Sequence, residues 1–251
     1  MGKIPVAVQM FTLRDKCEKD FFGTLQKVAD FGFDGVELAG YWGYTVTEVK
    51  EMLNKLGLKV AGNHISIDEL QNNIAQIIED QDILENQYVI CPFLPLHLRG
   101  EEGYKNLVSF LNETGEICQQ KGITLCYHNH DFELETLSDG KTALDMIFTD
   151  TNPNYVKAEF DVYWLTKAAE DPVEWMERYI NRTPLVHLKD MTLDGEKFFA
   201  ELGTGGVNLE AILNRGEEND VQWWVIEQDV CRRDPFDSIE MSIQYLKKAA
   251  L

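Results

Sequence analysis

Eight short segments rich in apolar and β-branched residues recur along the chain, and their even spacing limits the fold more than any other feature. Their starts are roughly 25–40 positions apart, which leaves room for one helix and two short loops in each interval. The strands that we expect are Ile4–Gln9, Gly35–Leu38, Leu58–Asn63, Tyr88–Cys91, Ile123–His128, Val156–Asp161, Leu185–Leu188 and Trp223–Glu227. Repeated strand–helix units of this kind are typical of a parallel sheet.

The intervals between these segments carry helix signals. The segment 20–32 has apolar residues at helical spacing and ends on a glycine, and residues 106–121 show the same pattern. Thr45 or Thr47 is placed to cap a helix that ends before Gly57, and Pro172 suits the first turn of another. Eight units in 251 residues predict an α/β fold, a (β/α)8 TIM barrel in which residues 1–251 form a single domain.

A doubly wound open sheet is the other fold that alternating strands and helices allow, but it usually has fewer strands and a glycine-rich first turn. The chain has no such turn after its first strand. Its nearest glycine-rich motif, Gly203-Thr204-Gly205-Gly206, follows no strand directly and precedes an expected helix start at Val207. We interpret this motif as a loop that leads into a helix rather than as a phosphate-binding turn.

The charge of the chain argues against nucleic-acid partners. With 43 acidic and 23 basic side chains the formal net charge is −20, whereas binding a phosphate backbone needs a basic surface. No apolar run approaches the ~20 residues that span a bilayer, and the first residues lack a signal-peptide core. We therefore expect a cytoplasmic protein that acts on small molecules, and self-association into a homo-oligomer stays open.

Polar residues occupy the carboxyl ends of seven of the eight expected strands, where the catalytic groups of such barrels lie. These residues include Gln9, Thr12, Arg14, Glu37, His64, His128, His130, Asp161, His187, Lys189, Glu227 and Asp229. Four of the five histidines belong to this set, and only His97 does not. Histidines that converge with carboxylates predict a site for one divalent ion, Mn²⁺, Zn²⁺, Co²⁺ or Fe²⁺. A purely structural polar network is the alternative.

Several segments in order carry a family resemblance. They are Val6-Ala7-Val8-Gln9-Met10-Phe11-Thr12-Leu13-Arg14-Asp15, Gly35-Val36-Glu37-Leu38, Tyr127-His128-Asn129-His130-Asp131-Phe132-Glu133, Phe160-Asp161-Val162-Tyr163-Trp164, Val186-His187-Leu188-Lys189-Asp190, Leu202-Gly203-Thr204-Gly205 and Ile226-Glu227. With them the chain resembles the xylose-isomerase-like TIM-barrel superfamily of sugar (phosphate) isomerases and epimerases. Inosose dehydratases and keto-glycoside-processing enzymes are relatives within it.

The resemblance implies one metal ion held at the ends of the last four barrel strands. Carried over by position, Asp161, His187 and Glu227 are expected to be ligands. Many epimerases of the superfamily have a glutamate at the place that His128 occupies here. The resemblance then points to Glu133 as the fourth ligand, with His128 as the fallback.

The same residues suggest a mechanism based on proton transfer. We expect His128 or His130 to act as a base and Glu227 as a second acid or base, next to a carbonyl that the metal polarises. Lys189 follows His187 by two positions, so strand geometry points both side chains to the same face. We expect Lys189 to stabilise developing negative charge, or else to pair with a neighbouring carboxylate.

Five further residues are expected to bind the substrate. His64 would contact a hydroxyl group of the substrate, or else act as a structural cap. Glu37 would also bind the substrate, or else orient a neighbouring basic group. Trp42 and Trp164 would cover the CH faces of a sugar, although aromatic residues near strands often only fill space. Arg14 would meet a phosphate or carboxylate, or else pair with a nearby acidic side chain.

These expectations favour a metal-dependent isomerase or epimerase that acts on a sugar, keto-sugar or cyclitol. A metal-dependent lyase is the second choice, either a dehydratase of a keto-inositol or an enzyme that eliminates a group from a 3-keto-glycoside. A sugar-binding barrel without catalysis is a third interpretation. A phosphodiesterase like endonuclease IV would need more histidine ligands and a more basic groove than this acidic chain offers.

Overall fold

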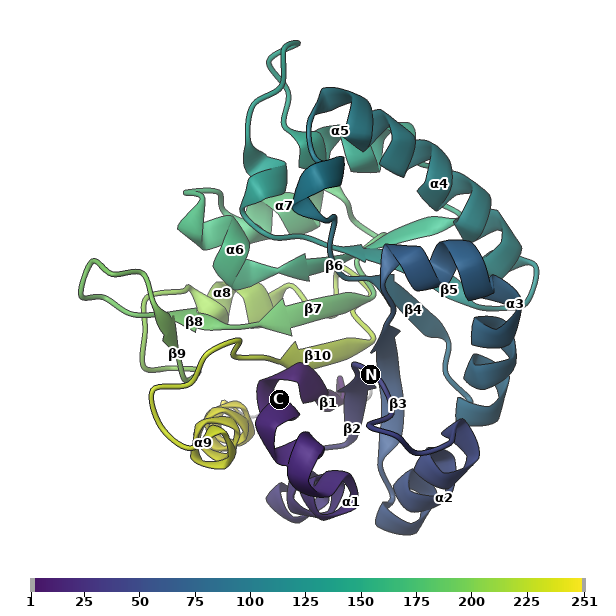
Figure 1. Cartoon of the computed structure of the whole chain (residues 1–251). Helices are drawn as coiled ribbons and strands as arrows, with labels where there is room; N and C mark the ends of the chain where they lie inside the picture. Colours follow the sequence, from purple (N-terminus) through teal and green to yellow (C-terminus); the bar gives the residue numbers. More distant parts are fainter. Residues whose placement is uncertain (1–2, 250–251) are drawn as a thin grey trace.

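Eight parallel strands close into a barrel in the computed structural model, which describes residues 3–249 (Figure 1). The barrel strands are β1 (Val6–Gln9), β2 (Gly35–Leu38), β3 (Lys59–His64), β4 (Tyr88–Cys91), β5 (Thr124–His128), β6 (Val156–Asp161), β7 (Leu185–Leu188) and β10 (Trp223–Ile226). The last of them, β10, pairs in parallel with β1 and closes the ring. The predicted (β/α)8 barrel is confirmed, and the strand ends differ from the prediction by at most two residues.

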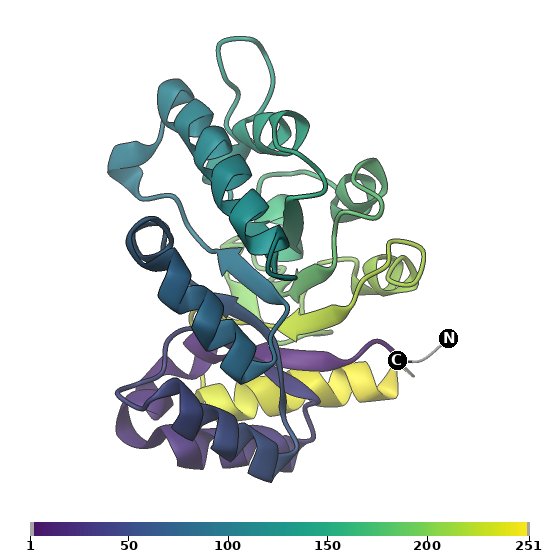
Figure 2. The same cartoon turned by 90° about the vertical axis from the view of Figure 1, so that its right-hand side faces the viewer.

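Helices surround the strands on the outside, as the two views together show (Figures 1 and 2). They are α1 (Arg14–Phe31), α2 (Val46–Leu56), α3 (Ile67–Leu84), α4 (Glu101–Gln119), α5 (Ala143–Asp150), α6 (Val162–Lys167), α7 (Pro172–Arg178), α8 (Leu209–Asn214) and α9 (Pro235–Lys248). Short 3-10 turns lie at η1 (Met10–Leu13), η2 (Leu96–Leu98) and η3 (Phe132–Leu134), and β8 (Asp190–Met191) pairs with β9 (Phe199–Ala200) in a hairpin. Within residues 3–249, each helix is too short or too polar to cross a membrane.

The helix α2 illustrates how local sequence sets the elements. Thr45 accepts a hydrogen bond from the backbone N–H of Glu48, whose carboxylate accepts one from the backbone N–H of Thr45 at 2.8 Å. This reciprocal cap satisfies two N–H groups that the first helical turn leaves unpaired. Gly57 ends the helix with φ 70°, a left-handed conformation that costs glycine little.

The interior of the barrel changes from apolar to polar along its axis. Small and apolar side chains fill the middle: Ala7, Ala61, Ile90, Cys126, Leu185 and Val225. Two positions further along β5, β7 and β10, the inward side chains are His128, His187 and Glu227. Every second residue of a strand points inward. The alternation that places apolar side chains in the core therefore also places ionisable side chains inside the carboxyl end of the barrel.

One glycine on β3 makes room for this polar layer. A Cβ atom on Gly62 would lie 2.5 Å from Cδ1 of Ile90 and 2.9 Å from Oε1 of Glu37. Both distances are shorter than real contacts of a Cβ atom. The absence of a side chain at Gly62 thus lets the fully buried Glu37 lie inside the barrel.

Candidate metal centre and active site

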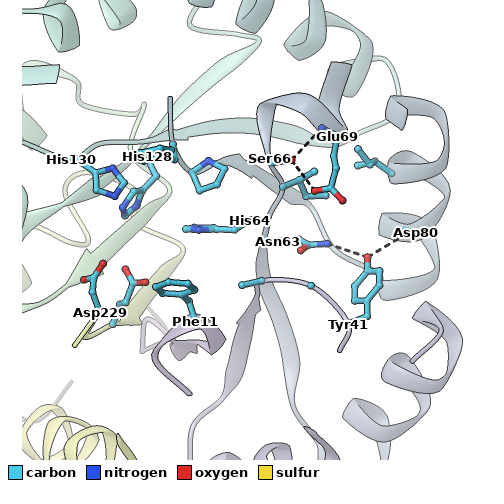
Figure 3. A pocket seen from close by; sticks show the side chains of 17 residues that line it. Phe11, Tyr41, Asn63, His64, Ser66, Glu69, Asp80, His128, His130 and Asp229 are labelled. Atoms are coloured by element: carbon cyan, nitrogen blue, oxygen red, sulfur yellow. Dashed lines mark hydrogen bonds between the residues drawn. The ribbon is translucent and has the colours of Figure 1, made fainter. Parts of the chain in front are cut away.

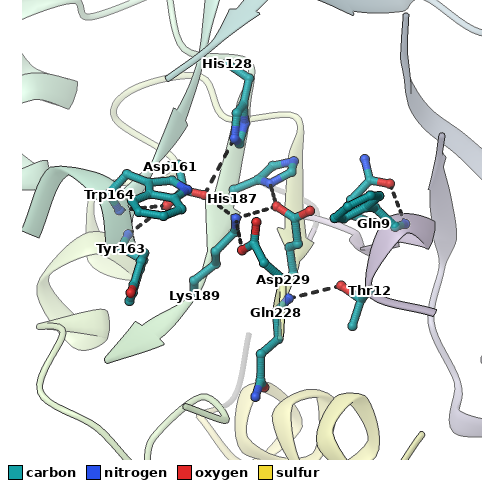
Figure 4. A network of polar contacts seen from close by, with 12 residues as sticks. Gln9, Thr12, His128, Asp161, Tyr163, Trp164, His187, Lys189, Gln228 and Asp229 are labelled. Carbon is teal, nitrogen blue, oxygen red and sulfur yellow. Dashed lines mark hydrogen bonds and ion pairs between the residues drawn. The ribbon is translucent and has the colours of Figure 1, made fainter. Parts of the chain in front are cut away.

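Four potential metal ligands meet at the carboxyl end of the barrel (Figure 4). His128 ends β5, Asp161 ends β6, His187 lies on β7 and Glu227 follows β10. One ligand atom of each residue lies within 4.8 Å of those of the other three, and all four side chains are buried. We call these four residues the upper group. Three of the four expected metal ligands belong to it, together with His128, the fallback.

Asp161 presents one carboxylate oxygen to the upper group. Its Oδ1 atom accepts hydrogen bonds from the backbone N–H groups of Tyr163 and Trp164 at 2.9 and 3.0 Å, which caps α6. Its Oδ2 atom is buried and forms an ion pair with Nζ of Lys189 at 2.9 Å. Burial raises the pKa of Asp161 to about 6, against the opposing effect of Lys189.

His187 links the carboxylates of two strands and of the loop after β10. Its Nδ1 atom lies 2.9 Å from Oε2 of Glu227, and its Nε2 atom lies 2.6 Å from Oε2 of Glu37. Burial alone would lower the pKa of His187, but Glu159 and Glu37 raise it well above its ordinary value. Burial likewise opposes ionisation of Glu227, whereas Lys189 and His187 hold the pKa of its carboxyl well below the usual range.

Lys189 is almost completely buried among three carboxylates. Its Nζ atom lies 2.9 Å from Asp161, 2.6 Å from Glu227 and 2.7 Å from Asp229. Burial opposes the charge, but Asp161 and Asp229 raise the pKa of Lys189 well above its ordinary value. Lys189 therefore pairs with neighbouring carboxylates, which is one of the two roles expected of it. It also places a fixed positive charge at the site.

A second group lies deeper and shares two histidines with the first. His64, His128, Glu159 and His187 also have ligand atoms within 4.8 Å of one another. Oε2 of Glu159 lies 2.8 Å from Nε2 of His64 and 3.1 Å from Nδ1 of His128, while its Oε1 atom is buried without a hydrogen-bond partner among the described residues. Sequence reasoning missed Glu159 because it searched strand ends. The alternation along β6, where Glu159 precedes Asp161 by two, was the available signal.

Glu37 and His64, both expected to bind the substrate, differ in their position relative to the cavity. Glu37 is completely buried, accepts a hydrogen bond from Nε2 of Gln9 at 2.7 Å and does not line the cavity described below. His64 does line that cavity. Burial opposes protonation of His64, but Glu37 and Glu159 raise its pKa to about 9.

Glu133 lies in neither group, in contrast to the expectation that it supplies the fourth ligand. Its Oε1 atom accepts a hydrogen bond from the hydroxyl of Tyr127 at 2.7 Å, and its Oε2 atom accepts one from the backbone N–H of His130 at 2.8 Å. The 3-10 turn η3 directs this carboxylate back onto β5, so His128 takes the place in the upper group. Burial raises the pKa of Glu133 to about 7, which the hydroxyl of Tyr127 opposes.

His130 lies at the edge of the site with a free ring nitrogen. Its Nδ1 atom is buried and has no hydrogen-bond partner among the described residues, and its ring stacks on that of Phe132 with centroids 5.5 Å apart. Burial and then the charge of Lys189 lower the pKa of His130 to about 3. An imidazole with this pKa is neutral at pH 7.

A cavity of about 690 Å³ opens beside these groups (Figure 3). At one end His128, His130, Glu227 and Asp229 line it. The remaining wall comes from the loops after β1 to β4 and from α3: Phe11, Ala39, Gly40, Tyr41, Asn63, His64, Ile65, Ser66, Glu69, Ile77, Asp80, Pro92 and Phe93. This volume is in the range of pockets that take small molecules, ~300–1,000 Å³.

The aromatic and basic residues expected at the substrate lie outside the lining of the cavity. Trp42 stacks on Phe21 with ring centroids 4.7 Å apart, and Trp164 packs against Tyr163 and Phe199. The guanidinium of Arg14 donates hydrogen bonds to two backbone carbonyls, at 2.9 and 3.0 Å. The aromatic walls come instead from Phe11, Tyr41 and Phe93. No periodic pattern in the sequence distinguishes these three residues from other aromatic residues.

Comparison with known proteins agrees with this architecture. Residues 25–249 match the family model of the xylose isomerase-like TIM barrel. The inosose dehydratase of Clostridium tetani is 22% identical over 93% of this chain and 91% of its own length. That of Clostridium beijerinckii is 27% identical over 79% of this chain and 67% of its own.

Solved structures give the same fold. A sugar phosphate isomerase/epimerase from Parabacteroides distasonis superposes with a TM-score of 0.83 at 25% identity, covering 99% of this chain and 95% of that one. A probable 3-DHS dehydratase from Bacillus anthracis superposes with a TM-score of 0.76 at 12% identity, covering 97% of this chain and 98% of that one. The second likeness concerns the fold alone.

Proposed function

The chain belongs to the xylose isomerase-like TIM-barrel family, and we propose that it is a metal-dependent isomerase or epimerase of a sugar, keto-sugar or cyclitol. In this proposal a proton moves at the carbon next to a carbonyl group. The observation that carries it is the meeting of the upper group, Lys189 and His130 at one end of a cavity.

The upper group has the donors that a divalent ion needs. Two imidazoles and two carboxylates suit Mn²⁺, Zn²⁺, Co²⁺ or Fe²⁺, and all four side chains are buried with ligand atoms within 4.8 Å of one another. His128, Asp161, His187 and Glu227 would hold the ion. When bound, it supplies Lewis acidity that polarises a carbonyl oxygen of the substrate.

The side chains around the cavity account for the movement of the proton. His130 lines the cavity, so its imidazole is placed to act as the base that takes a proton from the carbon beside the carbonyl. Glu227 also lines this end of the cavity, and its carboxylate can serve as the second group that accepts or returns a proton. Lys189 contacts Glu227 and Asp229, from where its charge stabilises the oxygen that becomes negative.

A lyase reaction is the second candidate, because the relatives named inosose dehydratase align with 79–93% of this chain. Its first step is the same removal of a proton next to a carbonyl. The neighbouring hydroxyl group then leaves as water instead of the proton returning to carbon. His64, held between Glu37 and Glu159 at the cavity wall, is placed to donate the proton that this departure requires.

Metal content and isotope exchange test the proposal. We expect about one divalent ion per chain after incubation with Mn²⁺ and desalting, and we expect ketoses in D₂O to gain deuterium beside the carbonyl. His187→Ala should abolish both results. His97→Ala is the matched control, because His97 is exposed and belongs to neither group.

The outcomes separate the interpretations. Loss of water from an inosose without isomerisation of any ketose would select the lyase. Sugar binding without exchange or elimination would select a non-catalytic barrel. Full turnover in His187→Ala would refute the assignment of the site.

A further inference from the structure

The cavity extends well beyond the proposed reaction centre (Figure 3). Figure 3 shows His128, His130 and Asp229 at one end and a second set of residues at the other. This set consists of Tyr41, Asn63, Ser66, Glu69 and Asp80, and we call the part of the cavity that they line the arm. Tyr41 and Ser66 come from the loops after β2 and β3, Asn63 from β3 itself, and Glu69 and Asp80 from α3. The arm lies at the opposite end of the cavity from Asp229 (Figure 3).

The size of the cavity exceeds what one sugar ring fills. A hexose has twelve non-hydrogen atoms, and even at the ~30 Å³ that a water molecule takes in the liquid it would need only about 360 Å³. The cavity holds about 690 Å³. A single ring at the reaction centre therefore leaves the arm free for another part of the ligand.

The charges on the cavity wall all have one sign, apart from the histidines. Among the described residues that line it, the acidic side chains are Glu69, Asp80, Glu227 and Asp229, and none is lysine or arginine. His64 is held between the carboxylates of Glu37 and Glu159 at 3.0 and 2.8 Å, so these two groups balance a proton on its ring. A phosphate group in the arm would meet carboxylates and no counterion, which is unfavourable in a partly enclosed site.

Two arginines at the rim are held behind aromatic walls of the cavity. The guanidinium of Arg14 lies 4.3 Å from the ring centroid of Phe11, and that of Arg99 lies 4.9 Å from the ring centroid of Phe93. Arg14 donates hydrogen bonds to backbone carbonyls of Phe11 and Asp229, and Arg99 donates one to that of Leu94. One nitrogen of each guanidinium is thus directed to the backbone, and Phe11 and Phe93 rather than the two arginines line the cavity.

The glycine-rich loop cannot serve as the phosphate site either. The carboxylate of Asp190 accepts hydrogen bonds from the backbone N–H groups of Gly203, Gly205 and Val207 at 3.0, 2.9 and 3.0 Å. These are the amides that an anion would need. A protein carboxylate already occupies the place of the anion, so the loop is closed to a ligand phosphate.

The groups in the arm suit hydroxyl groups instead. The hydroxyl of Tyr41 accepts a hydrogen bond from Asn63 at 3.2 Å and donates one to Asp80 at 3.4 Å, and the hydroxyl of Ser66 donates one to Glu69 at 3.0 Å. Carboxylate oxygens have further lone pairs that accept from hydroxyl donors. Phe11 and Phe93 keep 43% and 42% of their surface exposed and can cover the CH face of a ring.

From these observations we infer that the arm binds an uncharged, hydroxyl-bearing second part of the substrate, and that the cavity rejects phosphate esters. The inference rests on the proposed function for the position of the reacting ring. It specifies the substrate class: an unphosphorylated sugar or cyclitol that carries a further polar ring or group.

Calorimetric binding to the full chain incubated with Mn²⁺ tests this inference. The probes are D-fructose, D-fructose 6-phosphate, inorganic phosphate and isomaltulose, a ketose that carries a glucose ring. We expect isomaltulose to bind at least tenfold more tightly than fructose, and the phosphate ester at least tenfold more weakly. Equal or tighter binding of the ester, competition by inorganic phosphate, or no binding of either neutral sugar would overturn the inference.

A pair of charge reversals locates the effect in the arm. Glu69→Lys places a cation at the wall of the arm, and it should improve binding of fructose 6-phosphate at least tenfold while weakening that of isomaltulose. Asp68→Lys is the control, because Asp68 precedes Glu69 on α3, carries the same charge and does not line the cavity. Ser66 caps α3 through the backbone N–H of Glu69, so the cap survives both substitutions. Equal effects of the two variants would overturn the inference.

Binding also separates this inference from the proposed reaction. The preference for neutral two-ring ligands over phosphate esters is measured on the unaltered chain, next to turnover of the same ketoses. A protein with this preference but without turnover would refute only the proposed reaction. Turnover of ketoses together with tight binding of phosphate esters would refute only the inference about the arm.

Discussion

The two sides of the barrel mouth differ in how they use polar side chains. On the side of β6, β7 and β10, Asp161, His187 and Lys189 are almost completely buried and satisfy one another by ion pairs and hydrogen bonds. On the side of the arm, Ser66 and Glu69 are exposed, and their contacts leave room for a ligand. In the proposed function, the first side carries the chemistry and the second recognises the substrate.

Strand geometry explains the difference. The strands β6 and β7 each point two polar residues inward at successive positions, Glu159 with Asp161 and His187 with Lys189, the last lying just past β7. Their charges are therefore fixed in a rigid and poorly solvated layer. The arm combines loop residues with residues of β3 and α3, and among them Ser66 and Glu69 reach solvent.

The largest effect is expected from removing the charge of Lys189. Lys189→Met leaves Asp161, Glu227 and Asp229 without their cation, and breaking a buried ion pair costs about 3–5 kcal/mol of unfolding free energy. Urea unfolding measures this loss. Lys167→Met is the control, because Lys167 forms a partly exposed pair with Asp131 at 3.1 Å, and such pairs contribute about 1 kcal/mol or less. Similar losses of unfolding free energy in both variants would show that the buried ion pairs of Lys189 contribute no more to stability than the partly exposed pair of Lys167.

A contrast between His128 and Glu133 sharpens the assignment of the strand-five ligand. His128→Ala should weaken Mn²⁺ binding by about 100-fold or more, because it removes a donor from the upper group. Glu133→Gln should leave Mn²⁺ binding within about threefold, since the Glu133 carboxylate contacts Tyr127 and the backbone of His130. Titration with Mn²⁺ measures both. The reverse order of effects would return the ligand role to Glu133.

An intermediate effect is expected for Glu159, which positions two histidines without lining the cavity. Glu159→Gln disturbs its contacts with His64 and His128, and losing such a partner of a metal ligand typically costs about 10–100-fold in affinity. Mn²⁺ titration and the KM for substrate together test this expectation. The control is Glu116→Gln on the surface of α4. Unchanged metal affinity would confine Glu159 to a structural role.

The smallest effect is expected on the recognition side. Phe93→Ala removes an aromatic wall, and such contacts contribute about 0.5–1.5 kcal/mol, so KM should rise about two- to tenfold with kcat nearly unchanged. Steady-state kinetics measure the split between KM and kcat. Leu96→Ala, at a residue that is 75% exposed and outside the cavity, is the control. A large fall in kcat for Phe93→Ala would contradict the division of the mouth into two sides.

Local patterns in the sequence were enough to predict much of this molecule. The spacing of eight apolar segments predicted the barrel, and the carboxyl ends of parallel strands necessarily meet at one rim. This rule brought His64, His128, Asp161, His187 and Glu227 together without any knowledge of the tertiary structure. Strand periodicity also predicted that Lys189 shares a face with His187.

Side chains outside this periodicity were harder to place. Trp42 and Trp164 follow strands directly, but their loops turn them into packing contacts, whereas Phe93 from an apolar strand end reaches the cavity. A short turn decided that Glu133 points back to β5. Sequence spacing gives no direction for a side chain in a loop, because loop backbones have no fixed repeat.

The sequence by itself determined the barrel and the end of it at which polar groups gather, because strand spacing and a period of two are local properties of the chain. Only the tertiary structure decided which carboxylate meets which base, as Glu159 does with His64 and His128 across neighbouring strands. Only it showed that the arm is free of lysine and arginine among the described residues that line it. Those features depend on residues far apart in the chain, whose distances are set by the closure of the barrel and by the packing of its loops.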